Sequence, residues 1–256
     1  MRTGDTLGAV LVGGASRRFG SDKARAHFRG EPMLRRVLRA MEGATERVVL
    51  VGAATGADPA GGSGEALADI VDREGGGRGG EERGGLDVEV LADTVADAGP
   101  LAGLHAALRE ARRCGLGGVL AAGCDLPLLT PALLARIAEV GRGSGRSAAV
   151  PVLGPGRLQP LAAWYSLRCL DAAEARLAGE ERSLVGLLSR VDAVRIPTPE
   201  LRGEGEGEVE VTLRLTGANT PEELAALDAE GPGPGRTPLP PSLSVIGYKD
   251  SGKTGV

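Results

Sequence analysis

Short apolar segments alternate along this chain with amphipathic segments, and this alternation constrains the possible fold more than any other feature. Each apolar segment is bounded by glycine, aspartate or proline, which is typical of buried strands. The predicted strands are Leu7–Val12, Arg47–Val51, Val88–Leu91, Gly118–Ala122, Ala148–Val152, Pro160–Trp164 and Val209–Leu213.

Amphipathic helices are predicted between these strands, and several of them begin at a proline, where a missing N–H costs nothing. Thr130 and Thr220 stand before two such prolines as capping residues. An α/β fold follows, with a mainly parallel sheet, helices on both faces and a ligand site at the carboxyl ends of the strands. The predicted helices are Pro32–Met41, Pro100–Arg113, Pro131–Val140, Leu167–Leu177, Ser183–Arg190 and Pro221–Leu227.

Composition excludes several classes of protein. The net charge of −4 argues against a nucleic-acid binder, which would carry a basic face. The first apolar stretch is too short for a signal peptide or a membrane span. The three cysteines are widely spaced and form no paired motif, so we interpret them as reduced thiols. We therefore expect a cytoplasmic protein without nucleic-acid or membrane partners.

Glycine and proline also divide the chain into parts. We predict one domain over residues 1–229, with a glycine-rich insertion at 52–85, followed by a Pro/Gly linker at 230–241. Residues 242–256 hold a short strand and the pattern G-x-x-x-x-G-K-T from Gly247 to Thr254, which is a P-loop. Because the sequence stops at Val256 without the helix that such a loop needs, we expect a truncated P-loop segment that cannot work alone.

A glycine-rich basic loop follows the first predicted strand. Gly13 and Gly14 let the backbone turn sharply and bring several N–H groups close to an anion. Ser16 adds a hydroxyl donor, while Arg18 and Lys23 add positive charge that can offset a triphosphate. The spacing fits neither a dinucleotide fingerprint nor a P-loop. We predict that this loop binds a nucleoside triphosphate.

Two aspartates follow later strands. Asp93 either caps a turn or contacts the sugar, base or metal of a nucleotide. Asp125 ends a buried strand just before Pro127 and is a candidate Mg²⁺ ligand, since one or two carboxylates typically hold this ion in triphosphate sites. The alternative for Asp125 is a turn-forming residue. Its neighbour Cys124 has no histidine near it in sequence, so we interpret it as a buried residue and not as a nucleophile.

Together these segments resemble molybdenum cofactor guanylyltransferase, the enzyme family that converts molybdopterin to its guanine dinucleotide form. The resemblance runs from about Leu7 to Leu227, and the segment from Ser242 resembles the start of the family's GTP-binding adaptor partner, a P-loop protein. It implies a Rossmann-like nucleotidyltransferase domain that transfers GMP from GTP to molybdopterin. The motifs that carry it are Gly13–Lys23, Asp93–Gly103, Gly123–Pro127, Ala178–Ser183 and Ala218–Leu224.

The resemblance also implies roles for single residues. Gly13 stands where CTP-using relatives tend to have alanine, so GTP is favoured. An asparagine that the family has two residues before Asn219 is replaced by Gly217. Molybdopterin-binding or molybdoenzyme-maturation proteins are implied as further partners. The expected catalytic residues are Arg18, Lys23 and Asp125, the expected nucleotide-binding residues are Leu11, Val12, Gly13, Gly14, Ser16, Lys23, Asp93 and Asp125, and the expected Mg²⁺ ligand is Asp125.

Two other functions compete with this one. The first is another nucleotidyl transfer on the same fold, from CTP to molybdopterin or from an NTP to a sugar phosphate. The second is a non-catalytic GTP-binding adaptor, which the late P-loop segment suggests.

Overall fold

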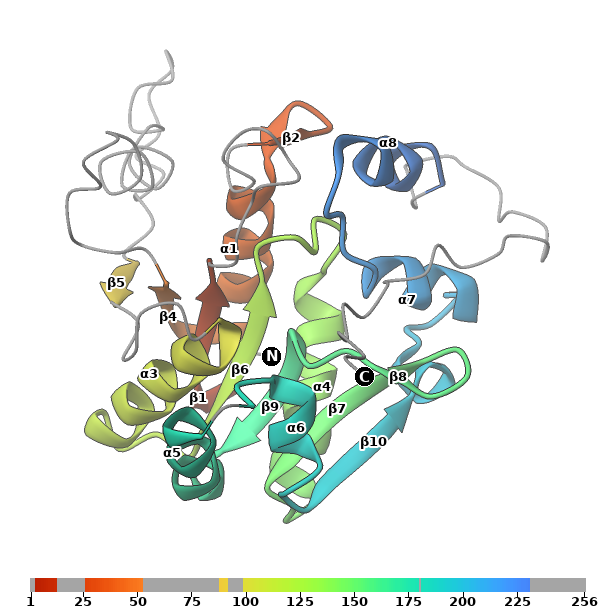
Figure 1. Cartoon of the computed structure of the whole chain (residues 1–256). Coiled ribbons are helices and arrows are strands. Elements are labelled where there is room, and N and C mark those ends of the chain that lie inside the picture. Colours follow the sequence, from red (N-terminus) through yellow and green to blue (C-terminus); the bar gives the residue numbers. More distant parts are fainter. Residues whose placement is uncertain (1–2, 13–25, 53–87, 92–98, 180, 231–256) are drawn as a thin grey trace, which may run out of the picture.

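The computed structural model describes residues 3–12, 26–52, 88–91, 99–179 and 181–230. Within these ranges one large sheet forms the centre of the molecule (Figure 1). Of the predicted insertion at 52–85 and the predicted linker at 230–241, the structure describes only Gly52 and Glu230; the rest of both, and the P-loop segment at 242–256, lie outside the described residues. The strands of this sheet are β1 (Thr3–Leu11), β4 (Thr45–Val51), β5 (Glu89–Leu91), β6 (Gly118–Gly123), β7 (Ala148–Leu153), β8 (Arg157–Leu158), β9 (Ala162–Ser166) and β10 (Ala193–Pro197).

The sheet is mainly parallel, as the sequence predicts. Its order is β10-β7-β9-β6-β1-β4-β5, with β8 paired to β7. β1 pairs in parallel with β4 and β6, and β10 pairs in parallel with β7. β9 is antiparallel to both of its neighbours. Every residue of β6 is buried, which explains its continuous apolar sequence, because helices cover both faces of such a strand.

Helices pack on both faces of the sheet (Figure 1). On one face α1 and α4 cover side chains such as Leu50 and Leu120. On the other face α3, α5 and α6 cover side chains such as Leu7 and Val119. Val119 and Leu120 point to opposite faces because side chains alternate along a strand. The helices are α1 (Met33–Ala44), α3 (Pro100–Arg113), α4 (Pro131–Gly143), α5 (Leu170–Ala178), α6 (Leu184–Leu188), α7 (Glu208–Arg214) and α8 (Pro221–Glu230).

Trp164 of β9 fills a slot that two glycines leave open. A Cβ added at Gly141 would lie 2.5 Å from Trp164 Cδ2, and a Cβ added at Gly118 would lie 2.8 Å from Trp164 Cζ2. The indole Nε1 donates a hydrogen bond to Thr6 Oγ1 at 3.3 Å. The indole ring is therefore tightly enclosed, and its one polar atom, Nε1, is hydrogen-bonded.

The predicted strand Val209–Leu213 is wrong, because this segment forms the helix α7. Its apolar residues alternate in sequence and so imitate a strand. The fold instead buries Val211 and Leu215, which are one helical turn apart, and leaves Val209 54% exposed. Glu210 and Arg214 add an ion pair of 2.7 Å between successive turns of the helix.

Other elements also differ from the sequence predictions. The sequence predictions omit β10, whose residues are mostly half-buried or exposed and so lack an apolar run. The first helix begins at Met33 because Pro32 belongs to a small hairpin of β2 (His27–Phe28) and β3 (Glu31–Pro32). No helix in the described part of the chain has the length and apolar character that crossing a membrane requires.

A small satellite core joins segments that are far apart in sequence. The hairpin β2–β3 contributes Phe28, the loop after β6 contributes Leu128, and α8 contributes Leu224 and Leu227. Ala218, in the segment before α8, is fully buried in the same cluster. Burial of these side chains fixes the end of the domain against the loop that follows β6.

Candidate functional site

The carboxyl ends of four neighbouring strands meet at one edge of the sheet. In the strand register Leu11 of β1 is level with Val51 of β4 and with Gly123 of β6, and Val51 is level with Leu91 of β5. The pairing continues past the strands, since Val12 N donates to Val51 O at 2.7 Å. Ligands of open α/β sheets bind at such an edge.

Asp125 lies at this edge, directly beyond β6. Cys124 N donates to Leu11 O at 3.2 Å, so the turn that carries Asp125 is tied to the end of β1. The aspartate is half-buried, and Cys124 is buried with 8% exposure, as expected from its place at the strand end. The structure therefore brings the predicted residues Leu11, Val12 and Asp125 to one edge. The other predicted site residues lie outside the described residues: Gly13, Gly14, Ser16, Arg18, Lys23 and Asp93.

A segment that sequence reasoning did not assign to the site contacts Asp125. Ala218 N donates to the backbone oxygen of Asp125 at 3.0 Å. The side chain of Gln159 anchors the same segment, because its Nε2 donates to Leu215 O at 2.6 Å. At its other end Glu223 Oε2 accepts from Asn219 N at 2.6 Å, and Glu223 N donates to Thr220 Oγ1. The T-x-x-E pattern from Thr220 to Glu223 predicts these hydrogen bonds, which cap the N-terminus of α8. No pattern in the sequence predicts the contact with Asp125.

Positive charge gathers on the hairpin and the start of α1, next to the loop after Asp125. Arg36 Nε donates to Pro127 O at 3.0 Å and so holds that loop. Partial burial lowers the pKa of Arg36, the negative charge of Glu31 opposes this, and the positive charges of Arg29 and Arg39 lower it further. Glu31 also forms an ion pair of 2.9 Å with Arg39. Of these arginines, Arg36 contacts the loop directly, and sequence reasoning did not single it out because it lies in no motif.

The residues present at this edge fit a metal that is shared with a nucleotide. Asp125 offers one carboxylate, and the described residues contain no group of three or more His, Cys, Asp or Glu that could hold a metal ion. Mg²⁺ is commonly bound by one or two carboxylates and completes its six ligands with phosphate oxygens and water. Among the described residues, the half-buried Asp125 supplies one carboxylate of the kind that such a site uses.

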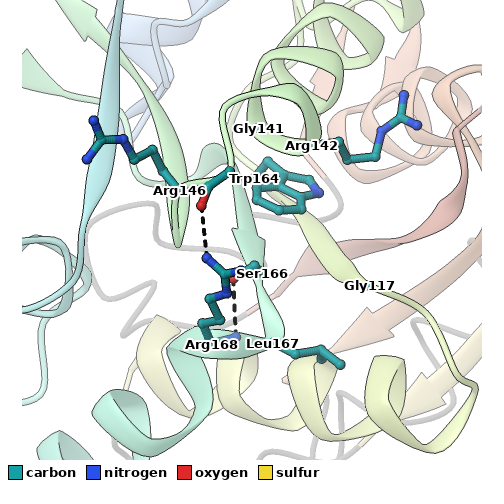
Figure 2. A pocket seen from close by; sticks show the side chains of 9 residues that line it. Gly117, Gly141, Arg142, Arg146, Trp164, Ser166, Leu167 and Arg168 are labelled. Carbon is teal, nitrogen blue, oxygen red and sulfur yellow. Dashed lines mark hydrogen bonds between the residues drawn. The ribbon is translucent and has the colours of Figure 1, made fainter.

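A cavity of about 300 Å³ lies at the end of the sheet opposite to Asp125. It opens beside Trp164 and Ser166, at the end of the antiparallel strand β9 (Figure 2). Its arginines do not converge on a common point: Arg146 is bound to Asp192 at 2.6 Å, and Arg168 donates to the backbone oxygen of Gly145 at 2.9 Å. The cavity therefore lacks the geometry of a triphosphate site.

Comparison with known proteins connects this architecture to a family. The MobA-like NTP transferase domain matches residues 8–194. The chain is 34% identical to a probable molybdenum cofactor guanylyltransferase of Opitutus terrae, over 69% of this chain and 74% of that protein. It is 31% identical to a protein of the same name from Pelotomaculum thermopropionicum, over 85% of this chain and 89% of that protein.

Solved structures agree at the level of the fold. Molybdopterin-guanine dinucleotide biosynthesis protein A of Archaeoglobus fulgidus has a TM-score of 0.63 at 24% identity, covering 88% of this chain and 97% of that one. The 2-C-methyl-D-erythritol 4-phosphate cytidylyltransferase of Thermus thermophilus has a TM-score of 0.54 at 18% identity, covering 88% and 98%. These likenesses confirm the predicted Rossmann-like nucleotidyltransferase fold. Because the match runs from β1 into β10 and so includes the strand ends around Asp125, the chain belongs to the MobA-like NTP transferase family of nucleotidyltransferases.

Proposed function

We propose that this chain transfers GMP from GTP to molybdopterin, giving the guanine dinucleotide form of the cofactor and pyrophosphate. The observation that carries the proposal is the place of Asp125, at the carboxyl edge of the sheet and tied to the end of β1 through Cys124. The names of relatives at 34% and 31% identity support the same substrates. We also infer a cytoplasmic location, where GTP is available.

The transfer follows from positioning and charge. A terminal phosphate oxygen of molybdopterin forms a bond to the α-phosphorus of GTP, and the bond from that phosphorus to the β-phosphate bridging oxygen breaks in line. Pyrophosphate leaves with the electron pair, so no covalent enzyme intermediate is needed. Asp125 is the residue that would hold Mg²⁺, which supplies neutralisation of the charge that develops on the phosphate oxygens.

The loop after β1 supplies the remaining groups in this proposal. Arg18 and Lys23 hold the phosphates, assisted by the backbone N–H groups of Gly13 and Gly14 and by the hydroxyl of Ser16. The nucleotide lies against the end of β1 at Leu11 and Val12, and Asp93 contacts the guanosine. Molybdopterin-binding or molybdoenzyme-maturation proteins would deliver the acceptor or take up the product.

We expect GTP to be preferred over CTP. Gly13 leaves room for the larger purine ring. The fit of the base to its pocket alone should make kcat/KM for GTP at least about 10-fold higher than for CTP. The measurement is pyrophosphate release by the purified full chain with molybdopterin and each of the four NTPs, together with transfer of label from [α-³²P]GTP to molybdopterin. A preference for CTP would instead support a cytidylyltransferase, and product formed only with a sugar phosphate would reject molybdopterin as the acceptor.

We further propose that the transferase domain over residues 1–229 acts without the linker at 230–241 and the P-loop segment at 242–256. Replacing Lys253 by alanine removes the lysine with which a P-loop contacts phosphates. In the full chain we expect GTP binding and GMP transfer of Lys253→Ala to equal those of the wild type. Loss of GTP binding in this variant would support the adaptor function instead.

A further inference from the structure

Arg157, in β8, carries a guanidinium group that lacks a partner for a buried nitrogen. The residue is half-buried, and its Nη2 is buried without a hydrogen bond. Arg176 and Arg214 also have a buried nitrogen without a hydrogen bond, but each of these two forms an ion pair with a glutamate. Within the described ranges Arg157 takes part in no ion pair. Its positive charge is therefore not balanced by a contact with the described chain.

A buried charged group without a partner costs free energy. It has given up hydrogen bonds to water, and it needs an acceptor or an opposite charge in exchange. Nearly all buried polar groups in folded proteins have such a partner, and an exception indicates a group with a catalytic or ligand-binding task. A guanidinium presents its N–H donors in a planar fork that fits phosphate and carboxylate groups. Arg157 is thus suited to bind an anionic ligand.

The strand pairings place Arg157 at the carboxyl edge of the sheet. Arg157 is paired with Leu153, the last residue of β7. β9 is antiparallel to both β7 and β6, so β7 and β6 end at the same edge. Val152 pairs with Leu158 of β8 and also with Pro197 of β10, so β8 lies on the side of β7 that faces β9. β8 therefore extends the line of β9, which is the neighbour of β6.

The segment between Arg157 and β9 is tied to the turn that carries Asp125. Gly123 N, at the end of β6 and two residues before Asp125, donates to Leu161 O at 2.8 Å. The side chain of Gln159, two residues after Arg157, donates to the segment between α7 and α8 that also contacts Asp125. Arg157 and Asp125 thus belong to neighbouring turns at one edge of the sheet.

The side chain of Arg157 lies on the face of the sheet that α7 covers. Residues paired directly across antiparallel strands point to the same face. Leu153, the partner of Arg157, is buried on the same face as Leu215, which follows α7. Leu158, the next residue in β8, packs on the opposite face, as alternation along a strand requires. The guanidinium is therefore on the same side of the sheet as the segment that contacts Asp125.

We propose that Arg157 binds the terminal phosphate of the acceptor in the transfer reaction. This inference rests on the proposed function, in which that phosphate attacks the α-phosphorus of GTP in line, opposite to the leaving pyrophosphate. The loop after β1 is assigned to the phosphates of GTP, and β8 lies on the other side of β6 from β1. Arg157 thus reaches the metal site from the side on which an in-line reaction places the nucleophile.

Arg157→Met tests the role of the charge, because methionine is also long and unbranched but neutral. Replacement of an unpaired buried guanidinium by an apolar side chain should leave the unfolding temperature unchanged or raise it. An arginine that serves the fold would instead give a lower unfolding temperature when it is replaced. Arg142→Met is the matched control, since Arg142 is exposed and lines the cavity at the end of the sheet opposite to Asp125.

The first measurement is steady-state GMP transfer by the full chain, with GTP and molybdopterin varied in turn. For Arg157→Met we expect KM for molybdopterin to rise roughly 10- to 100-fold, the effect of losing a hydrogen bond to a charged group. KM for GTP should not change. Arg157→Lys should recover part of the loss, because an ammonium restores the charge but not the fork. Arg142→Met should match the wild type in both KM values.

The second measurement needs no turnover and uses inorganic phosphate as the probe. Thermal unfolding of the full chain is followed with α,β-methylene-GTP bound, so that the nucleotide site is occupied, while phosphate replaces chloride at constant ionic strength. A ligand that binds only the folded state raises its unfolding temperature. We expect phosphate to stabilise the wild type and Arg142→Met, and to stabilise Arg157→Met distinctly less.

The other outcomes overturn the inference or separate it from the proposed function. A rise of KM for GTP in Arg157→Met in place of KM for molybdopterin overturns it, because the arginine then serves the nucleotide. Unchanged KM values, equal stabilisation by phosphate or a lower unfolding temperature without phosphate overturn it as well. If the wild type forms no product from GTP and molybdopterin but phosphate stabilises it through Arg157, the proposed function fails and the anion site stands for another phosphorylated acceptor.

Discussion

Replacing Asp125 by asparagine is expected to lower kcat for GMP transfer on the order of 10³-fold, because a bound metal contributes several kcal/mol of charge stabilisation. Asparagine has nearly the same shape as aspartate and so fits the same space, but its neutral amide is a poor ligand for Mg²⁺ beside a triphosphate. The hydrogen bond from Ala218 N to the backbone oxygen of residue 125 does not depend on the side chain and remains. Activity should therefore be lost without loss of the fold.

The measurement is transfer of label from [α-³²P]GTP to molybdopterin at saturating GTP, with a thermal melt of each protein followed by circular dichroism. Asp192→Asn is the matched control. Asp192 is 61% exposed in its side chain and pairs with Arg146 beside the cavity at the opposite end of the sheet. Its neutralisation should leave kcat unchanged. An Asp125→Asn protein within about 3-fold of wild-type kcat, a difference of well under 1 kcal/mol, would reject Asp125 as the metal ligand.

Replacing Trp164 by alanine is expected to lower the free energy of unfolding by about 3–5 kcal/mol, the usual cost of removing a buried aromatic ring. Trp164 is 5% exposed, and its ring fills the slot beside Gly118 and Gly141. Glycines have no side chain that could move into the vacated space, so the cavity cannot close well. Loss of the indole also leaves Thr6 Oγ1, a buried group, without the hydrogen bond from Nε1.

Urea unfolding followed by far-UV circular dichroism measures this loss. Val209→Ala is a suitable control, since Val209 is 54% exposed on α7 and surface substitutions usually change stability by less than about 0.5 kcal/mol. A Trp164→Ala loss no larger than that of Val209→Ala would show that the slot between the two glycines is not tightly packed. Activity per folded molecule should change less than in Asp125→Asn, because Ser166, next but one to Trp164 in β9, lies at the edge of the sheet away from Asp125.

The sequence predicted the central part of the fold well because burial on both faces leaves a strong local signal. β6 is apolar throughout, and β1 and β4 each end in a buried apolar run, Leu7–Leu11 and Val48–Val51, which marks their positions in the sequence. Edge strands lack that signal, so β10 escaped detection. α7 was mistaken for a strand because, in so short a segment, alternating apolar residues fit the two-residue repeat of a strand as well as the repeat of a helix. The joint burial of Val211 and Leu215, one helical turn apart, identifies the helix.

The antiparallel direction of β9 shows another limit of local patterns. Its residues are all buried, and burial alone carries no information on which way a strand runs. Direction depends on how the connection from β7 returns across the sheet, and β8 turns that connection back on itself by pairing antiparallel with β7. Neither feature alters the spacing of apolar residues in the sequence.

By itself the sequence determined that the chain is an α/β nucleotidyltransferase and that Asp125 stands at the end of a buried strand. Strand ends and glycine-rich turns leave short-range signatures, because the residues that make them are neighbours in the chain. Only the tertiary structure decided which distant residues come to the same edge of the sheet. Ala218 contacts Asp125 because the satellite core draws the segment before α8 onto the loop after β6, and contacts of that kind arise from packing of distant residues.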